Sequence, residues 1–121
     1  MPTHALNWFE LPAVDMDRAI RFYSTILDKR MERNDIGMPY SFLPAENGGV
    51  GGALIQNENY VPSNNGPVIY LNGGDDLQVV LDRVEGAGGK IIMKKMSIGE
   101  NGFVAMFIDT EGNRVGLHSD S

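Results

Sequence analysis

The sequence contains no cysteine, and this absence excludes disulfide bridges, thiolate zinc sites and a cysteine nucleophile. It has only two histidines, His4 and His118, so imidazole ligands are scarce as well. Basic residues are few, because 10 Lys and Arg stand against 16 Asp and Glu and give a formal net charge of −6. Nucleic acids and anionic membrane surfaces attract cationic proteins, so neither is expected as a partner.

Long apolar runs are also missing. No stretch approaches the roughly 20 apolar residues that span a bilayer, and the first residues show no basic segment followed by an apolar run. These observations predict a cytoplasmic protein. Apolar residues make up 42% of the 121 positions, which is enough to bury the core of one domain.

The first half of the chain alternates strand and helix signals. Residues 5–11 predict a strand, and Asp15 is a suitable N-cap for a helix that runs to about Asp28. Short β segments follow at about 31–35, 40–44 and 50–57, with a glycine-containing turn at 46–49 before the last of them. The loop at 58–66 carries the strongest break signal in the chain.

The second half repeats this plan at an offset of 60 residues, with Trp8 matching Val68 and Asp15 matching Asp75. Residues 67–72 predict a strand, and Asp75 is expected to cap a helix, with Gln78 as its capping-box partner. Glycines at 86–89 end that helix, and strands are predicted at 90–95, 102–108 and 113–118. The chain is therefore interpreted as one domain made of a module at about 1–58, a linker at about 59–66 and a second module at about 67–121.

Two motifs in this order resemble the vicinal oxygen chelate superfamily, which includes glyoxalase I, bleomycin-resistance proteins and extradiol dioxygenases. They are DMDRAIRFY at 15–23 and FIDTEGNRVGLH at 107–118, in which Thr110 stands where the family often has proline. The sequence is similar above all to small bacterial proteins related to lactoylglutathione lyase. The resemblance implies an α+β fold of two βαβββ modules that form an open barrel, or cup, which a homodimer usually completes.

The resemblance also implies a divalent metal that polarises two neighbouring substrate oxygens, held by histidine, glutamine or glutamate. The family's four ligand positions correspond here to Trp8, Leu54, Val68 and Gly116, and none of these side chains offers a lone pair to a metal. Shifting each position by one residue gives only apolar side chains: Phe9, Ala53, Ile55, Pro67, Ile69, Val115 and Leu117. No cofactor is therefore expected, and the alternative is a divalent metal held by ligands that the motif does not identify, such as His4 or His118.

A different constellation surrounds Glu10. Side chains two residues apart in a strand share a face, so Glu10 is expected beside Trp8 on the cup face, while Phe9 and Leu11 face the helices. By the same parity, the candidate ligand pocket comprises Trp8, Glu10, Leu54, Gln56, Val68, Tyr70, Arg114 and Gly116. An aromatic pocket with a few fixed polar groups suits a flat organic ligand. The alternative is a structural ion pair between Glu10 and Arg114, with Trp8 filling space.

Two classes of function follow. The first is a metal-free binding protein that holds a small organic molecule in an aromatic cup. The second is an enzyme of the same superfamily, of the lyase, isomerase or dioxygenase type, acting through unidentified metal ligands or through Glu10 as a metal-free acid or base. His118 is a weaker candidate for a general base, and its alternative role is to cap the last strand at the surface.

Overall fold

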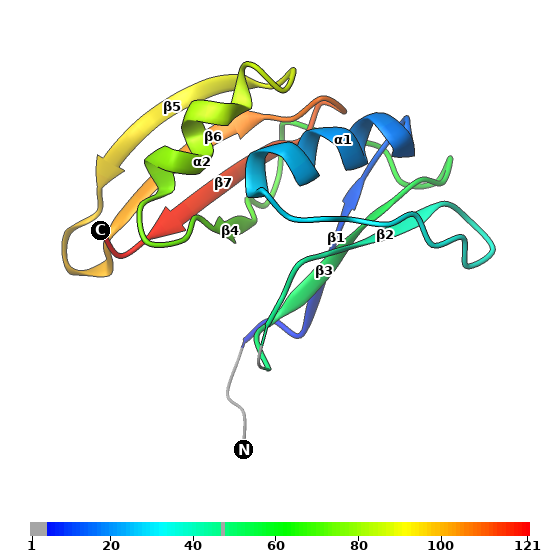
Figure 1. The fold of residues 1–121 in the computed structure, drawn as a ribbon, viewed down its shortest axis with the longest axis horizontal. Coiled ribbons are helices and arrows are strands. Elements are labelled where there is room, and N and C mark those ends of the chain that lie inside the picture. The colour runs from blue at the N-terminus through cyan, green and yellow to red at the C-terminus, as the bar shows by residue number, and fades with distance from the viewer. Residues whose placement is uncertain (1–4, 47) are drawn as a thin grey trace.

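The computed structural model describes residues 5–46 and 48–121. The described residues form two α-helices and two separate sheets. In Figure 1 the helices lie side by side, and the sheets pack against them. The elements in chain order are β1 (Trp8–Pro12), α1 (Met16–Leu27), β2 (Tyr40–Leu43), β3 (Gly51–Ile55), β4 (Tyr70–Asn72), α2 (Leu77–Val84), β5 (Lys90–Ser97), the short 3-10 helix η1 (Gly99–Asn101), β6 (Phe103–Ile108) and β7 (Arg114–Ser119).

Each sheet places its first strand parallel to its last. The first sheet has the order β1-β3-β2, and the second has the order β4-β7-β6-β5. In both sheets the helix connects the first strand to the antiparallel strands that follow. The α+β class is confirmed, and the two sheets stay open instead of closing into a barrel.

The start and end of α1 follow from local chemistry. Asp15 is in extended conformation, and its side chain accepts a hydrogen bond from the Arg18 N–H, so it is the predicted N-cap. Asp28 adopts the left-handed conformation with φ 53°, and its N–H closes the last turn. The prediction of a helix between Asp15 and Asp28 is confirmed.

The strand predicted at 31–35 is wrong. This segment lies beside β2 without forming a ladder, and its main-chain link is one hydrogen bond from the Asn34 N–H to the Tyr40 carbonyl. Arg33 forms ion pairs with Asp17 and Asp35, and the Ser41 hydroxyl binds the Glu32 carbonyl. The Glu32 carbonyl is thus bound by a side chain instead of a neighbouring strand, and the segment is irregular. The first module therefore has three strands.

The predicted cap of α2 is wrong by one residue, because Asp76 rather than Asp75 accepts the hydrogen bond from the Gln78 N–H. The repeat offset is 60 at the strand ends, where the N–H groups of residues 13 and 73 bind the carbonyls of residues 55 and 118. Gly74, with φ 78°, then adds one residue before the second helix. The offset at the caps is therefore 61.

One hydrophobic core serves both sheets. It combines the apolar stripes of the two helices with the helix-facing side of each sheet, and its members include Leu11, Phe22, Ile26, Leu43, Leu54, Leu71, Leu77, Leu81, Ala105, Phe107, Val115 and Leu117. Arg83 adds a hydrogen bond from its guanidinium to the Ile26 carbonyl, which joins α2 to the end of α1. The opposite face of each sheet therefore points away from this core.

Within the described residues, no helix combines the length and the apolar composition required to cross a membrane.

Candidate functional site

The outer face of the first sheet carries Trp8 and Glu10. Trp8 pairs with Gly51 and Glu10 with Ala53 on the central strand β3. These two small residues leave room for large side chains from the neighbouring strands, and a Cβ on Gly51 would lie 3.1 Å from Cζ3 of Trp8. The predicted sharing of one face by Trp8 and Glu10 is confirmed, with Leu11 buried in the core on the other side.

A chain of hydrogen bonds links these side chains through Tyr40. The indole Nε1–H of Trp8 donates to the Tyr40 hydroxyl oxygen at 3.2 Å, and the Tyr40 hydroxyl donates to Oε2 of Glu10 at 2.8 Å. Burial raises the pKa of Tyr40; the Trp8 hydrogen bond opposes this, and the Glu10 carboxylate adds to it. The phenol therefore stays protonated at neutral pH and directs its proton to Glu10.

Phe42 completes the group that we call the aromatic–carboxylate face, which consists of Trp8, Glu10, Tyr40 and Phe42. The Phe42 ring packs edge-to-face on Trp8, with centroids 5.9 Å apart, and on Tyr40, with centroids 5.5 Å apart. Tyr40 is only 6% exposed, whereas Trp8 is 44% and Phe42 50% exposed. Two aromatic rings and a half-buried carboxylate are thus open to solvent.

Leu54 and Gln56 do not lie on this face. The register places Ala53 beside Glu10, so Leu54 points to the opposite side and is buried in the core. Gln56 accepts a hydrogen bond from the Met16 N–H at 2.8 Å and so satisfies the first turn of α1. The predicted parity for the strand at 50–57 was wrong by one residue, a shift that exchanges the two faces of a strand.

The remaining pocket candidates lie on the second sheet. Tyr70 pairs with Gly116, and its ring occupies the space that a Cβ on Gly116 would need, while Val68 is half-buried just before β4. Arg114 donates to the Gly66 carbonyl at 2.6 Å, so the proposed ion pair with Glu10 is absent from the described residues. These residues therefore form a group separate from the aromatic–carboxylate face.

His118 also belongs to the second sheet. Its Nε2 lies 2.6 Å from the Asn101 carbonyl oxygen, a contact that ties β7 to η1. It lines a cleft of about 360 Å³ together with Tyr70 and Asn72. His4, the other histidine, lies outside the described residues.

The aromatic–carboxylate face is an open surface. A second cleft of about 580 Å³ lies between α2 and β5, and neither cleft is lined by Trp8 or Glu10. The predicted pocket combined residues from both sheets, but in a single chain the two sheets point these side chains away from one shared core. An enclosed cup that contains Trp8 therefore needs a further wall.

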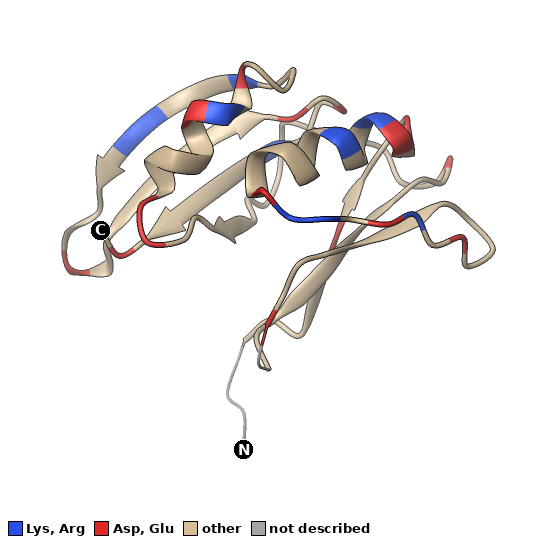
Figure 2. Cartoon of the chain, in the orientation of Figure 1, with Lys and Arg blue, Asp and Glu red and all other residues tan. Residues whose placement is uncertain are grey.

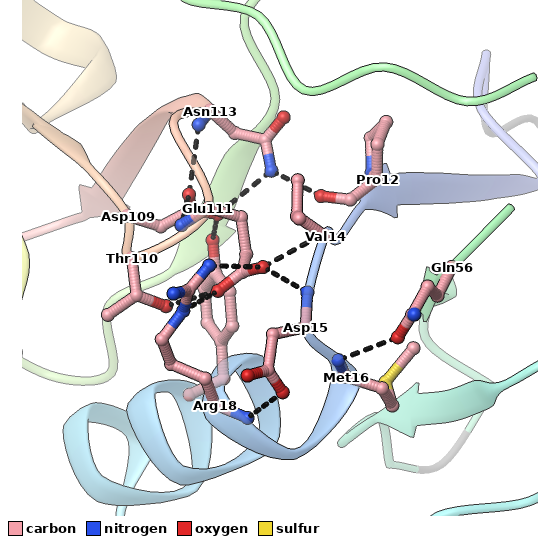
Figure 3. A network of polar contacts seen from close by, with 11 residues as sticks. Pro12, Val14, Asp15, Met16, Arg18, Gln56, Asp109, Thr110, Glu111 and Asn113 are labelled. Carbon is pink, nitrogen blue, oxygen red and sulfur yellow. Dashed lines mark hydrogen bonds and ion pairs between the residues drawn. The ribbon is translucent and has the colours of Figure 1, made fainter. Parts of the chain in front are cut away.

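A polar network holds the junction between β1 and α1 behind this face (Figure 3). The carboxylate of Glu111 accepts hydrogen bonds from the N–H groups of Val14 and Asp15, from the Arg18 guanidinium and from the Thr110 hydroxyl. Burial alone would raise the pKa of Glu111, but these hydrogen bonds outweigh it and lower the pKa.

Asp109 and Asn113 extend the same network. Oδ2 of Asp109 accepts a hydrogen bond from the Tyr23 hydroxyl at 2.6 Å, and the Asn113 side-chain amide donates to the Pro12 carbonyl at the end of β1. Burial raises the pKa of Tyr23 well above its usual value, and the charge of Asp109 raises it further. The turn after β6 thus fixes the end of β1, the strand that carries Trp8 and Glu10.

The donor atoms present do not fit the divalent metal that the resemblance implies. The four expected ligand positions hold an indole, two aliphatic side chains and a glycine, and two of them, Leu54 and Gly116, are covered by the core and by the Tyr70 ring. Within the described residues no three His, Cys, Asp or Glu side chains gather in a way that could hold a metal ion.

Sequence reasoning did not single out Tyr40 and Phe42. Both occur in a strand that was predicted, at alternating positions, so a shared face could be read from the sequence. Their place beside Glu10 depends on the register of β2 against β3, which pairs Tyr40 with Ile55 and Phe42 with Ala53. The small residues at 51–53 are the only local sign in the sequence that large side chains from the neighbouring strands lie over β3.

Among solved structures, the chain is similar to a glyoxalase/bleomycin resistance protein from Albidiferax ferrireducens T118, with a TM-score of 0.77 and 12% identity over 98% of this chain and 100% of that one. A glyoxalase-related enzyme from Fulvimarina pelagi gives a TM-score of 0.71 and 15% identity, covering 97% of this chain and 88% of that one. At these identities the similarity shows the fold.

Curated relatives in Mycobacterium bovis and Mycobacterium tuberculosis, both named "Putative glyoxylase CFP32", are 28% identical over 116 residues. The match covers 92% of this chain but 44% of those proteins, so the chain spans less than half of their length. The sequence-family model of the Glyoxalase/Bleomycin resistance protein/Dioxygenase superfamily matches residues 5–117 of this chain. This chain, with its two strand–helix–sheet modules, therefore belongs to that superfamily.

Proposed function

We propose that this chain binds a small organic molecule on the aromatic–carboxylate face. The observation that carries the proposal is the exposure of the Trp8 and Phe42 rings beside Glu10, whose Oε1 has no hydrogen-bond partner among the described residues. Exposed aromatic surface next to a positioned polar group is typical of ligand-binding surfaces. Ring stacking and one carboxylate, in place of a metal, would hold the ligand.

The single tryptophan makes this proposal directly testable. Trp8 is the only tryptophan in the chain, so its emission reports on this face alone. A panel of cationic, neutral and anionic small molecules is titrated while Trp8 emission and the melting temperature are followed. A ligand of this face is expected to change the emission saturably and to raise the melting temperature, because it binds the native state only.

Two alanine variants separate this face from the rest of the surface. Phe42→Ala removes one of the two exposed rings and is expected to weaken binding, whereas Val79→Ala truncates a similarly exposed apolar side chain on α2 and should leave binding unchanged. If ligands stabilise both variants equally well, or if no compound in the panel changes Trp8 emission, the proposal is wrong.

A second candidate function is proton transfer on a bound carbonyl compound, as in a metal-free isomerase or lyase. The observation in its favour is the 2.8 Å hydrogen bond that places a proton donor, Tyr40, beside the carboxylate of Glu10. A carbon acid bound on this face would then exchange its proton with solvent deuterium, which NMR detects. Glu10→Gln should abolish the exchange, and exchange that persists in this variant argues against this role.

A further inference from the structure

The first sheet presents a single sign of charge. Its three strands contain Glu10 as their only charged residue, and Figure 2 shows no Lys or Arg along them. None of the ion pairs among the described residues includes Glu10. A negatively charged ligand would therefore meet an uncompensated carboxylate, whereas a cation would be attracted to it.

The aromatic rings favour the same sign. The face of an aromatic ring carries the negative part of its quadrupole, so it attracts cations that lie over it. The interplanar angle is 72° between Trp8 and Phe42 and 79° between Tyr40 and Phe42, so neighbouring rings meet edge to face and form corners. The corner between Trp8 and Phe42, whose rings are 44% and 50% exposed, suits a compact cation better than a flat neutral molecule.

The hydrogen bonds among these residues keep the carboxylate ready for such a ligand. The Trp8 indole donates to Tyr40, and Tyr40 donates to Oε2 of Glu10, so each proton in the chain points towards the carboxylate. A donor directed at a carboxylate oxygen holds the carboxylate in position. Oε1, which has no hydrogen-bond partner among the described residues, is then the carboxylate oxygen available to a ligand.

We infer that the ligand of this face is an organic cation, a tertiary or quaternary ammonium group that contacts the Trp8 and Phe42 rings and lies beside the Glu10 carboxylate. This inference rests on the proposed function and specifies the chemical class of its ligand. It also predicts that the ligand's positive charge adds to its affinity beyond the apolar area that it shares with a neutral molecule of the same shape.

Choline and 3,3-dimethyl-1-butanol are the probes that test this inference. They have the same shape, but the first carries a quaternary nitrogen where the second has a carbon. Both are titrated into the full chain while Trp8 emission is followed. We expect choline to bind at least about tenfold more tightly, a difference that corresponds to about 1.4 kcal/mol of charge and cation–π attraction.

Three variants locate the effect. Phe42→Leu keeps an apolar side chain but removes the ring, and it should weaken choline binding without changing the binding of the neutral probe. Glu10→Gln should do the same, whereas Glu100→Gln, which removes an exposed carboxylate elsewhere, should leave both probes unaffected. Circular dichroism and melting curves verify that each variant is folded. If Glu10→Gln does not fold, the binding of choline to Phe42→Leu decides the question.

The outcomes separate this inference from the proposed function. If the two probes bind equally, or if an anionic compound of the wider panel is the one that changes Trp8 emission, the cation assignment is overturned and the binding function stands. If no compound of any charge acts on Trp8, both are wrong.

Discussion

At the scale of single residues, the buried carboxylate of Glu111 forms hydrogen bonds with several groups at the start of α1. Its side chain is 0% exposed, and its oxygens bind two N–H groups at the start of α1 and the Arg18 guanidinium. A charged acceptor that satisfies several donors contributes more than a neutral hydrogen bond does, and its removal leaves those donors unpaired. This residue joins the turn after β6 to the first helix.

Glu111→Gln is therefore expected to lower the free energy of unfolding by about 2–3 kcal/mol at neutral pH. The folded-state pKa of Glu111 is lowered, so its stabilisation is complete above the usual pKa of a glutamate and is lost as the pH falls through the folded-state value. The difference between the variant and the natural chain should thus shrink in acid. Urea unfolding at several pH values measures it.

The matched control for this residue is Glu100→Gln, because Glu100 is an exposed carboxylate outside the network. It should change stability little at any pH. If the difference in unfolding free energy between Glu111→Gln and the natural chain grows on acidification, the carboxylate is not held in its charged form.

At the scale of the element, the two sheets depend on glycine where aromatic rings cross a neighbouring strand. The Phe9 ring lies over Gly52, and a Cβ added at Gly52 would come within 2.5 Å of three ring atoms. Phe9 packs against the core on the helix-facing side, so its ring has little freedom to move away. The pairing of β1 with β3 therefore requires a residue without a side chain at this position.

Gly52→Ala should lower the free energy of unfolding by about 1–3 kcal/mol, the usual range for inserting atoms into a packed region. Gly86→Ala is the matched control, since a Cβ at Gly86 has no neighbour closer than the Arg83 carbonyl oxygen at 4.0 Å. Chemical denaturation of the two variants compares them. Equal stability of both would mean that Phe9 does not constrain β3.

The beginning of α2 offers a second test at this scale. Asp76 caps the helix and forms an ion pair with Lys95 at 2.8 Å, and the Lys95 hydrogen bond is the main reason that the pKa of Asp76 is lowered. Asp76→Ala should reduce the melting temperature, because it removes both the cap and the ion pair. Asp75→Ala, one residue earlier, should have a much smaller effect. If Asp75→Ala lowers the melting temperature more than Asp76→Ala does, Asp75 is the cap, as the repeat predicted.

At the scale of the whole molecule, both sheets have open edges. The edge strands β1 and β4 each have one neighbour, and the aromatic–carboxylate face, to which β1 contributes Trp8 and Glu10, is partly exposed. Unpaired strand edges and exposed apolar surface favour association with another chain. We propose that a second copy of this chain pairs with these edges and supplies a wall beside Trp8 that leaves room for the ligand, in a symmetric homodimer.

Light scattering at micromolar concentration should then give about twice the 13.3 kDa mass of one chain. Dilution should dissociate the dimer and shift Trp8 emission at the same concentrations, because the tryptophan lies at the proposed contact. A monomer mass throughout that range would contradict the proposal and would leave the aromatic–carboxylate face as an open binding surface.

The sequence alone predicted both α-helices, every strand except the one expected at 31–35, the superfamily and the N-cap of α1. These features depend on neighbours within a few residues: Asp15 reaches the Arg18 N–H, and alternation along the strand at 8–11 separates Trp8 and Glu10 from Phe9 and Leu11. Two predictions were wrong by one residue. The extra Gly74 moved the second cap, and the parity of Leu54 could not be read from an apolar run.

The tertiary structure alone decided which side chains share the candidate site. Tyr40 and Phe42 reach Glu10 and Trp8 through the register of two strands against β3, and residues 30 or more positions apart meet there. The same structure separated Tyr70 and Arg114 from Glu10, because both sheets pack on one core and turn their other faces outwards. Alternation within a strand is a local property, whereas register and sheet orientation result from packing of the entire chain.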